Sequence, residues 1–126
     1  MEKKVPAEKH EIPYRDGEYV GEVRGGLPHG IGTYTCKEFT YIGSWFYGTM
    51  SGLGVIHYAD GSYYTGAFYA DRRHGQGEEE QISAAGKIRY VGGWKNGKKH
   101  GRGVEISSRD GQVVRREGVW QDDVLS

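Results

Sequence analysis

Large aromatic residues and glycines alternate along this chain in a pattern that occurs five times. Its clearest occurrence reads Tyr41-Ile42-Gly43-Ser44-Trp45, followed by a loop and a Gly-x-Gly pair at Gly52 and Gly54. The other copies begin at Tyr19, Tyr64, Tyr90 and Arg116, and the last is partial. In the first four copies the Gly-x-Gly pair opens nine residues after the first glycine. Because a fixed period of about 20 to 50 residues is typical of repeat architectures, the pattern predicts a repeat protein.

Each copy has the alternation of a β-hairpin. Residues 41–45 would run outward and residues 52–58 would return, so that rings and glycines share one face of the sheet. A glycine beside a ring leaves space for the ring to lie flat across the neighbouring strand. Glycine every few residues would cost about 1 kcal/mol each in a helix. We therefore predict an all-β fold: an elongated, single-layer, twisted antiparallel sheet of four to five hairpins, about nine strands, with little or no helix.

The pattern also predicts the domain boundaries. Residues 1–15 contain Pro6 and Pro13 and are predicted to be a mobile N-terminal extension, or at most a poorly paired first strand. Residues 16–126 are predicted to form the array, with copies starting near 19, 41, 64, 90 and 116. Extra residues at 81–89 and 107–115 predict longer loops between the later hairpins. The strand from Arg116 to Trp120 is predicted to lack a returning strand and to leave an open sheet edge.

Composition narrows the function classes. The chain has 22 glycines, one cysteine (Cys36), and 17 basic against 17 acidic residues. A net charge of zero argues against a nucleic-acid partner. One cysteine excludes an internal disulfide and a Cys-x-x-Cys site, and we predict neither metal nor cofactor. Since there is no long apolar run and no secretory leader pattern, we expect a cytoplasmic protein.

A row of aromatic residues is the first candidate binding site. Because a single-layer sheet cannot cover both of its faces, part of this row is expected to form a groove for a partner helix or extended peptide. The alternative is that the rings are simply the core. The candidate residues are Tyr19, Tyr34, Tyr41, Trp45, Tyr58, Tyr64, Phe68, Tyr90, Trp94 and Trp120.

Basic residues in the loops of the third and fourth copies form the second candidate site, a basic edge for anionic lipid or an acidic partner. Its residues are Arg72, Arg73, Lys95, Lys98, Lys99 and Arg102. The alternative is a solvated loop, because Glu78, Glu79 and Glu80 follow closely. The recurring His29, His74 and His100 are expected to stabilise turns, since a catalytic or zinc site needs different groups that converge on one point. We predict no catalytic residue.

The motif Tyr-x-Gly-x-Trp, a short loop, His-Gly-x-Gly and an Asp-Gly turn resembles the MORN repeat (membrane occupation and recognition nexus). The resemblance extends from about Asp16 to Trp120. His29-Gly30, His74-Gly75 and His100-Gly101 match the His-Gly of the family, and Asp60-Gly61 and Asp110-Gly111 match its turn between repeats. The chain departs from the pattern at Val23, Ser51, Asp71, Glu79, Glu105 and Arg116.

The resemblance implies a non-enzymatic scaffold or adaptor that binds a protein partner, of the kind found in cytoskeletal, ciliary or membrane-contact proteins at the inner membrane surface. A peripheral phospholipid-binding module that uses the basic edge is the alternative. A regulatory subunit of an enzyme on another chain is compatible with the sequence. The open edge at the end of the array also predicts a homodimer through a terminal strand.

Overall fold

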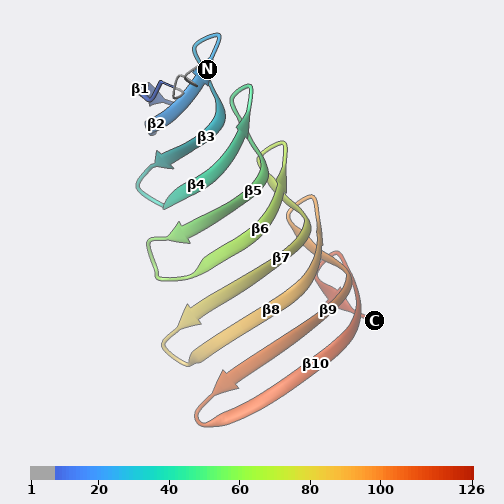
Figure 1. Ribbon diagram of the computed structural model, residues 1–126. Helices are drawn as coiled ribbons and strands as arrows, with labels where there is room; N and C mark the ends of the chain where they lie inside the picture. The colour runs from blue at the N-terminus through green and yellow to red at the C-terminus, as the bar shows by residue number, and fades with distance from the viewer. Residues whose placement is uncertain (1–7) are drawn as a thin grey trace, which may run out of the picture.

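A computed structural model describes residues 8–126 as one antiparallel sheet in which eleven strands follow one another in chain order (Figure 1). The strands are β1 (His10–Tyr14), β2 (Gly17–Arg24), β3 (Leu27–Thr35), β4 (Phe39–Phe46), β5 (Thr49–Tyr58), β6 (Tyr63–Tyr69), β7 (Arg72–Ser83), β8 (Gly86–Lys95), β9 (Lys98–Arg109), β10 (Gln112–Gln121) and β11 (Val124–Leu125). The predicted all-β, single-layer fold is confirmed. The described residues contain no helix long and apolar enough to cross a membrane.

The register lines up one glycine from each strand across the sheet. Gly43 of β4 pairs with Gly32 on one side and Gly54 on the other, and this column continues from β2 to β10. The tyrosine two residues before the strand glycine lies across the glycines. The ring of Tyr41 would be only 2.5 Å from a Cβ atom built on Gly54. Glycine is therefore needed at these positions because any side chain there would clash with a ring, as the sequence predicts.

Recurrent side-chain hydrogen bonds join the rings to the backbone. The Tyr41 hydroxyl donates to the carbonyl of Ser44 at 2.7 Å, where a β-bulge leaves that carbonyl free of the ladder. Tyr19, Tyr64 and Tyr90 make the same bond three residues along. The indole N–H of Trp45 donates to Gly32 of the preceding copy at 3.2 Å, and Trp94 and Trp120 repeat this contact. The second, fourth and fifth copies are thereby bonded to the copy before them, whereas Phe68 of the third copy has no N–H to donate.

The hairpin loops within the copies lie side by side at one end of the strands, along one long side of the array. Gly48 N–H donates to the carbonyl of Pro28 at 2.8 Å, and Asp71, Gly97 and Asp123 donate to the preceding copy in the same way. The Nδ1 atom of His29 accepts the backbone N–H of Tyr47 at 3.1 Å, and His74 accepts that of Asn96. These contacts give His29 and His74 the turn-stabilising role that the sequence predicts.

The structure differs from the sequence prediction at both ends. Residues 10–14 form strand β1, the alternative to a mobile extension, and they are fully paired with β2: Ile12 and Tyr14 face the core while Pro13 lies in register with Glu18. Residues 1–7 of the predicted extension lie outside the described residues. The fifth hairpin is closed by the short strand β11, whose Leu125 pairs with Trp120. The edge of β10 is thus covered only from Val119 to Gln121.

The extra residues of the later copies lengthen strands instead of loops. Strands β7 and β9 have 12 residues each, and the turns at 84–85 and 110–111 stay tight. Alternating side chains in both segments allow the ladder to continue, so the predicted longer loops are wrong. In Figure 1 the ribbons of β9 and β10 are accordingly longer than those of β3 and β4.

Candidate functional site

Nine of the ten predicted groove residues lie in the core. Their exposed fractions are 0 to 4%, and Tyr58 alone is half-buried. Tyr41 packs edge to face on Trp45 and Phe68, with ring centroids 5.2 and 5.1 Å apart, and the same arrangement recurs in the other copies. The exposure that the groove prediction assumed is not found, because the curved sheet brings a second layer of side chains over the rings.

This second layer changes character along the array. In the first two copies it consists of apolar side chains, among them Tyr34, Met50 and Ile56. In the third and fourth copies the equivalent register positions hold ion pairs, Arg73 with Glu79 and Lys99 with Glu105. Two residues change together each time, so a buried charge is never left without its counter-charge.

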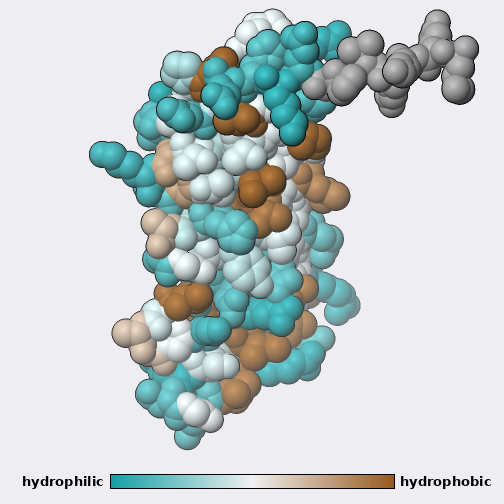
Figure 2. All heavy atoms as spheres, turned by 60° about the vertical axis from the view of Figure 1, so that its left-hand side comes forward, coloured by the Kyte–Doolittle hydropathy of each residue, from teal (hydrophilic) through white to brown (hydrophobic). Residues whose placement is uncertain are grey.

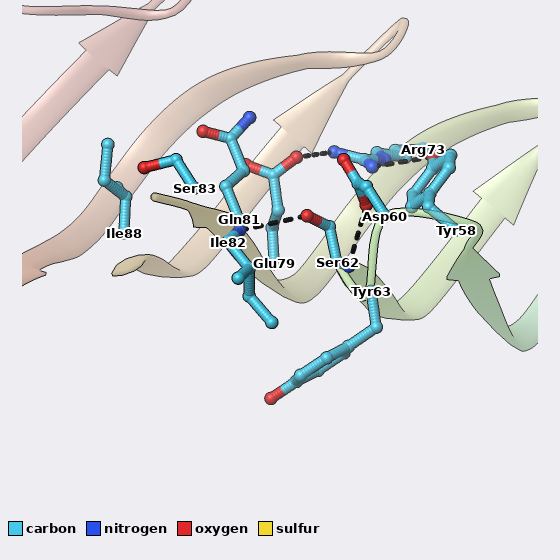
Figure 3. A pocket seen from close by; sticks show the side chains of 10 residues that line it. All are labelled: Tyr58, Asp60, Ser62, Tyr63, Arg73, Glu79, Gln81, Ile82, Ser83 and Ile88. Atoms are coloured by element: carbon cyan, nitrogen blue, oxygen red, sulfur yellow. Dashed lines mark hydrogen bonds and ion pairs between the residues drawn. The ribbon is translucent and has the colours of Figure 1, made fainter. Parts of the chain in front are cut away.

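The Arg73–Glu79 pair shows how these charges are held (Figure 3). The guanidinium carbon of Arg73 lies 4.6 Å from the ring centroid of Tyr64 and 4.9 Å from that of Trp94, and Nη2 donates to the Tyr58 hydroxyl at 2.9 Å. Lys99 lies similarly over Tyr90 and Trp120. The prediction that Arg73 and Lys99 belong to an exposed basic edge is therefore wrong: cation–π contacts and ion pairing turn both side chains inward.

A hollow of about 400 Å³ adjoins the Arg73–Glu79 pair. Its wall also includes Ser62 and Gln81, and the Ser62 hydroxyl accepts the backbone N–H of Ile82 (Figure 3). The Asp60 carboxylate, also in this wall, accepts the backbone N–H of Ser62. No group of three His, Cys, Asp or Glu side chains suited to a metal ion occurs within residues 8–126.

The exposed part of the basic edge is smaller than predicted. Arg72, Lys95 and Lys98 line an open hollow of about 420 Å³ at the hairpin loops, together with His100 and Asp122. None of the three cationic side chains forms an ion pair with any other residue of the 8–126 range. Arg102 is exposed on β9 and is not part of this wall. We call the wall formed by Arg72, Lys95, Lys98, His100 and Asp122 the basic hollow.

The turn between β1 and β2 covers the N-terminal end of the face that carries the core rings. The Tyr14 hydroxyl donates to the carbonyl of Gly48 at 2.6 Å, and Arg15 donates to the same carbonyl and to Asp71. The ring of Tyr14 stands edge-on to Trp45 at 6.2 Å. These contacts join turns at opposite ends of the strands, and Arg15 reaches both the second and the third copies. They remove the N-terminal rings from solvent.

The outer face of β3 to β6 is a candidate surface that the sequence analysis missed. These four strands contain no Asp, Glu, Lys or Arg. Alternation places the following side chains outward, and we call them the uncharged face: Ile31, Thr33, Thr35, Thr40, Ile42, Ser44, Phe46, Leu53, Val55, His57, Tyr63, Thr65, Ala67 and Tyr69. Leu53, Tyr69, Phe46 and Ile31 have the largest exposed fractions, from 71 to 59%.

A signal for this surface is present in the sequence. Between residues 25 and 70 the only charged residues are Lys37, Glu38 and Asp60, and all three lie between hairpins. From Arg72 onward charges also occupy outward strand positions, such as Glu78 paired with Arg89. In the view of Figure 2, hydrophobic residues form separate patches between hydrophilic ones.

The core tyrosines predict how stability depends on pH. Burial raises the pKa of Tyr19, Tyr34 and Tyr64 to about 12, and it raises the pKa of Tyr41 as well. An unfolded chain releases these protons near pH 10, whereas the folded chain retains them. The stabilisation is thus complete below about pH 10 and is lost as pH rises toward 12.

We therefore expect cooperative unfolding above pH 10. In an alkaline titration, most tyrosinate absorbance should appear together with the loss of the β-sheet circular dichroism signal. Ionisation of the core tyrosines in a protein that keeps its circular dichroism spectrum would contradict the hydrogen-bonding role of their hydroxyl groups.

Comparison with known proteins agrees with the repeat geometry. The MORN repeat family model matches residues 19–38, 41–63, 64–80 and 90–112. These four ranges correspond to the first four copies of the pattern, and the partial copy at Arg116 lies outside them.

The individual proteins that the chain matches are much longer than the chain itself. The chain is 39% identical over 122 residues to the protein named Alsin of Mus musculus and of Homo sapiens, and 39% identical over 121 residues to that of Rattus norvegicus. The alignments cover 89 to 90% of this chain and 7% of each relative. These matches agree with the repeated Tyr-x-Gly-x-Trp motif and with the column of glycines beneath its rings. They show that the chain belongs to the MORN repeat family.

Proposed function

We propose that the chain is a non-enzymatic module that binds a protein partner on the uncharged face. The family supports the coarser statement, a repeat module for protein or membrane interaction. The observation that favours a protein is the outer face of β3 to β6, where four neighbouring strands expose hydrophobic side chains and carry no charge. Contiguous apolar patches of this kind mark interaction sites.

The energetics favour this face over the inner rings. Covering an exposed side chain such as Leu53 or Phe46 is worth about 1.5 to 3 kcal/mol, and no charged group has to be desolvated there. A partner that reached Trp45 or Tyr41 would first have to displace the side chains that bury them. The outer face is available without rearrangement of the core.

The non-enzymatic part of the proposal is supported by the way candidate groups are distributed. His29 and His74 accept backbone N–H groups of the next hairpin loop, at equivalent places in different copies. Repetition spaces them along the array instead of bringing them to one point, whereas catalysis needs convergent groups. The carboxylates of Glu79 and Glu105 are paired with core cations.

A peripheral contact with an anionic bilayer is the second candidate. It is favoured by exposed Phe46 and Tyr69, which lie at successive hairpin loops, and Tyr69 pairs with Arg72 of the basic hollow. Aromatic rings suit the headgroup region, and each Lys or Arg near an anionic surface contributes about 1 kcal/mol. Binding of this kind should weaken steeply with added salt.

The two candidates are separated by one set of variants. We expect Leu53→Glu to abolish capture of protein partners from cell extract, measured by quantitative mass spectrometry. Val113→Glu is the matched control, since Val113 is similarly exposed at 67% but lies on the outer face of β10. If Leu53→Glu leaves the captured set unchanged, while charge reversal of Lys95 and Lys98 abolishes sedimentation with anionic vesicles, the bilayer candidate replaces the first.

A further inference from the structure

The uncharged face and the basic hollow adjoin, and together they indicate the chemistry of the partner. We infer that the partner segment is an amphipathic helix, whose apolar stripe covers the uncharged face and whose acidic residues enter the basic hollow. This inference rests on the proposed function, because it concerns the same surface. It adds the secondary structure and the charge of the bound segment, and the places where its apolar and acidic halves lie.

The two surfaces are continuous at the β6–β7 hairpin. Tyr69 pairs with Arg72 in the register, and the Tyr69 ring lies 5.9 Å from that of His74. Arg72 in turn lines the hollow with Lys95 and Lys98. A segment that leaves the uncharged face across β6 therefore meets cationic side chains immediately.

A helix fits the face better than an extended strand does. The backbone groups of β3 to β6 are already paired within the sheet, so a strand laid on this face would keep its own N–H and C=O groups unpaired. A helix satisfies its backbone internally. The row across the strands alternates large and small residues, Ile31, Ser44, Leu53 and Ala67, and so offers depressions for helix side chains.

The strand spacing sets the length of the helix. Strands lie about 4.8 Å apart, so β3 to β6 span about 14 Å and β6 to β9 span a similar distance. At about 1.5 Å per residue, a helix of about 20 residues covers both. One half should present the apolar stripe over β3 to β6, and the other half should carry the acidic residues over the basic hollow.

Electrostatics orients this helix. The hollow holds three cationic side chains without ion-pair partners among the described residues and only one carboxylate, that of Asp122. An acidic residue placed there is attracted, whereas the same charge over Leu53 would be desolvated without a counter-charge. The reverse orientation of the helix is thus disfavoured.

Two synthetic peptides of 20 residues test the inference. Both carry the same Leu and Ala stripe, and the polar positions of the second half are all Glu in one peptide and all Lys in the other. We expect the acidic peptide to bind at least tenfold more tightly, measured by fluorescence anisotropy. Leu53→Glu should weaken it at least tenfold, Val113→Glu should leave it unchanged, and Lys95→Glu with Lys98→Glu should reverse the preference.

Other results would overturn the inference. The oriented helix would be contradicted if the two peptides bound equally well, or if Leu53→Glu left the binding of the acidic peptide unchanged. Tighter binding to phosphatidylserine vesicles than to the acidic peptide assigns the surface to a bilayer. A dimer in light scattering that Leu53→Glu dissociates assigns it to a second copy of the chain.

The inference and the proposed function can fail separately. If Leu53→Glu abolishes partner capture from extract but the acidic peptide shows no preference, only the helix inference is lost. If capture is also unaffected, the protein-binding proposal fails as well. Circular dichroism and the thermal midpoint of each variant show that it is folded before binding is measured.

Discussion

Gly54→Ala is expected to destabilise the array by about 3 kcal/mol or more, at the upper end of the cost of overpacking a core. A Cβ atom at this position would lie 2.5 Å from Cε2 and Oη of Tyr41. The ring cannot retreat, because it is wedged between Trp45 and Phe68 and its hydroxyl is bonded to the Ser44 carbonyl. The urea midpoint of unfolding should fall accordingly, and much of a domain's stability of about 5 to 15 kcal/mol would be lost.

Gly97→Ala is the matched control. Gly97 has φ +85°, which costs an alanine roughly 1 to 2 kcal/mol, but nothing lies within 4 Å of its Cβ position. The comparison separates the need for space from the need for backbone freedom. Equal destabilisation by the two substitutions would show that the glycine column serves backbone conformation and not the packing of the rings.

The fold could be predicted from the sequence because its determinants are local and repeated. The Tyr-x-Gly-x-Trp spacing reports the strand period, and the fixed distance to the Gly-x-Gly pair reports the hairpin register. Because each position of the repeat occurs in several copies, the sequence shows several times which kind of residue that position requires. The ends were predicted wrongly because Tyr14 and Leu125 are held by contacts that have no counterpart in the repeat: Tyr14 by the carbonyl of Gly48, and Leu125 by Trp120.

Whether the predicted site residues are exposed depends on the curvature of the sheet. The spacing of aromatic residues and glycines in the sequence does not indicate that curvature. A flat sheet would have left Trp45 and Trp94 open on one face, whereas the observed sheet brings turns at opposite ends of its strands together, as the bond from Tyr14 to Gly48 shows. Arg73 and Lys99 were assigned to an exposed edge because they lie next to loops. Their inward direction follows from the register with Phe68 and Trp94, which requires the bulges to be known.

The Arg73–Glu79 pair gives the second large effect that we expect. Arg73→Met and Glu79→Ile should each destabilise the protein by about 3 to 5 kcal/mol, because each leaves one charge in the core without its partner. The double variant should regain most of this loss. It copies the pair Met50 and Ile56, which occupies the same register positions one copy earlier. Urea unfolding of the four proteins gives the coupling free energy as a double-mutant cycle.

The fourth copy supplies an internal test of this explanation. Glu105 is held by Lys99 and also lies 3.5 Å from Nη1 of Arg116, which stacks on Trp120. Replacing Lys99 by Met and Glu105 by Ile together therefore leaves Arg116 without its carboxylate, and the rescue should be less complete than at Arg73 and Glu79. Additive losses in the third copy would mean that the pair is not an exchangeable unit. Equal rescue in both copies would mean that Arg116 contributes nothing to holding Glu105.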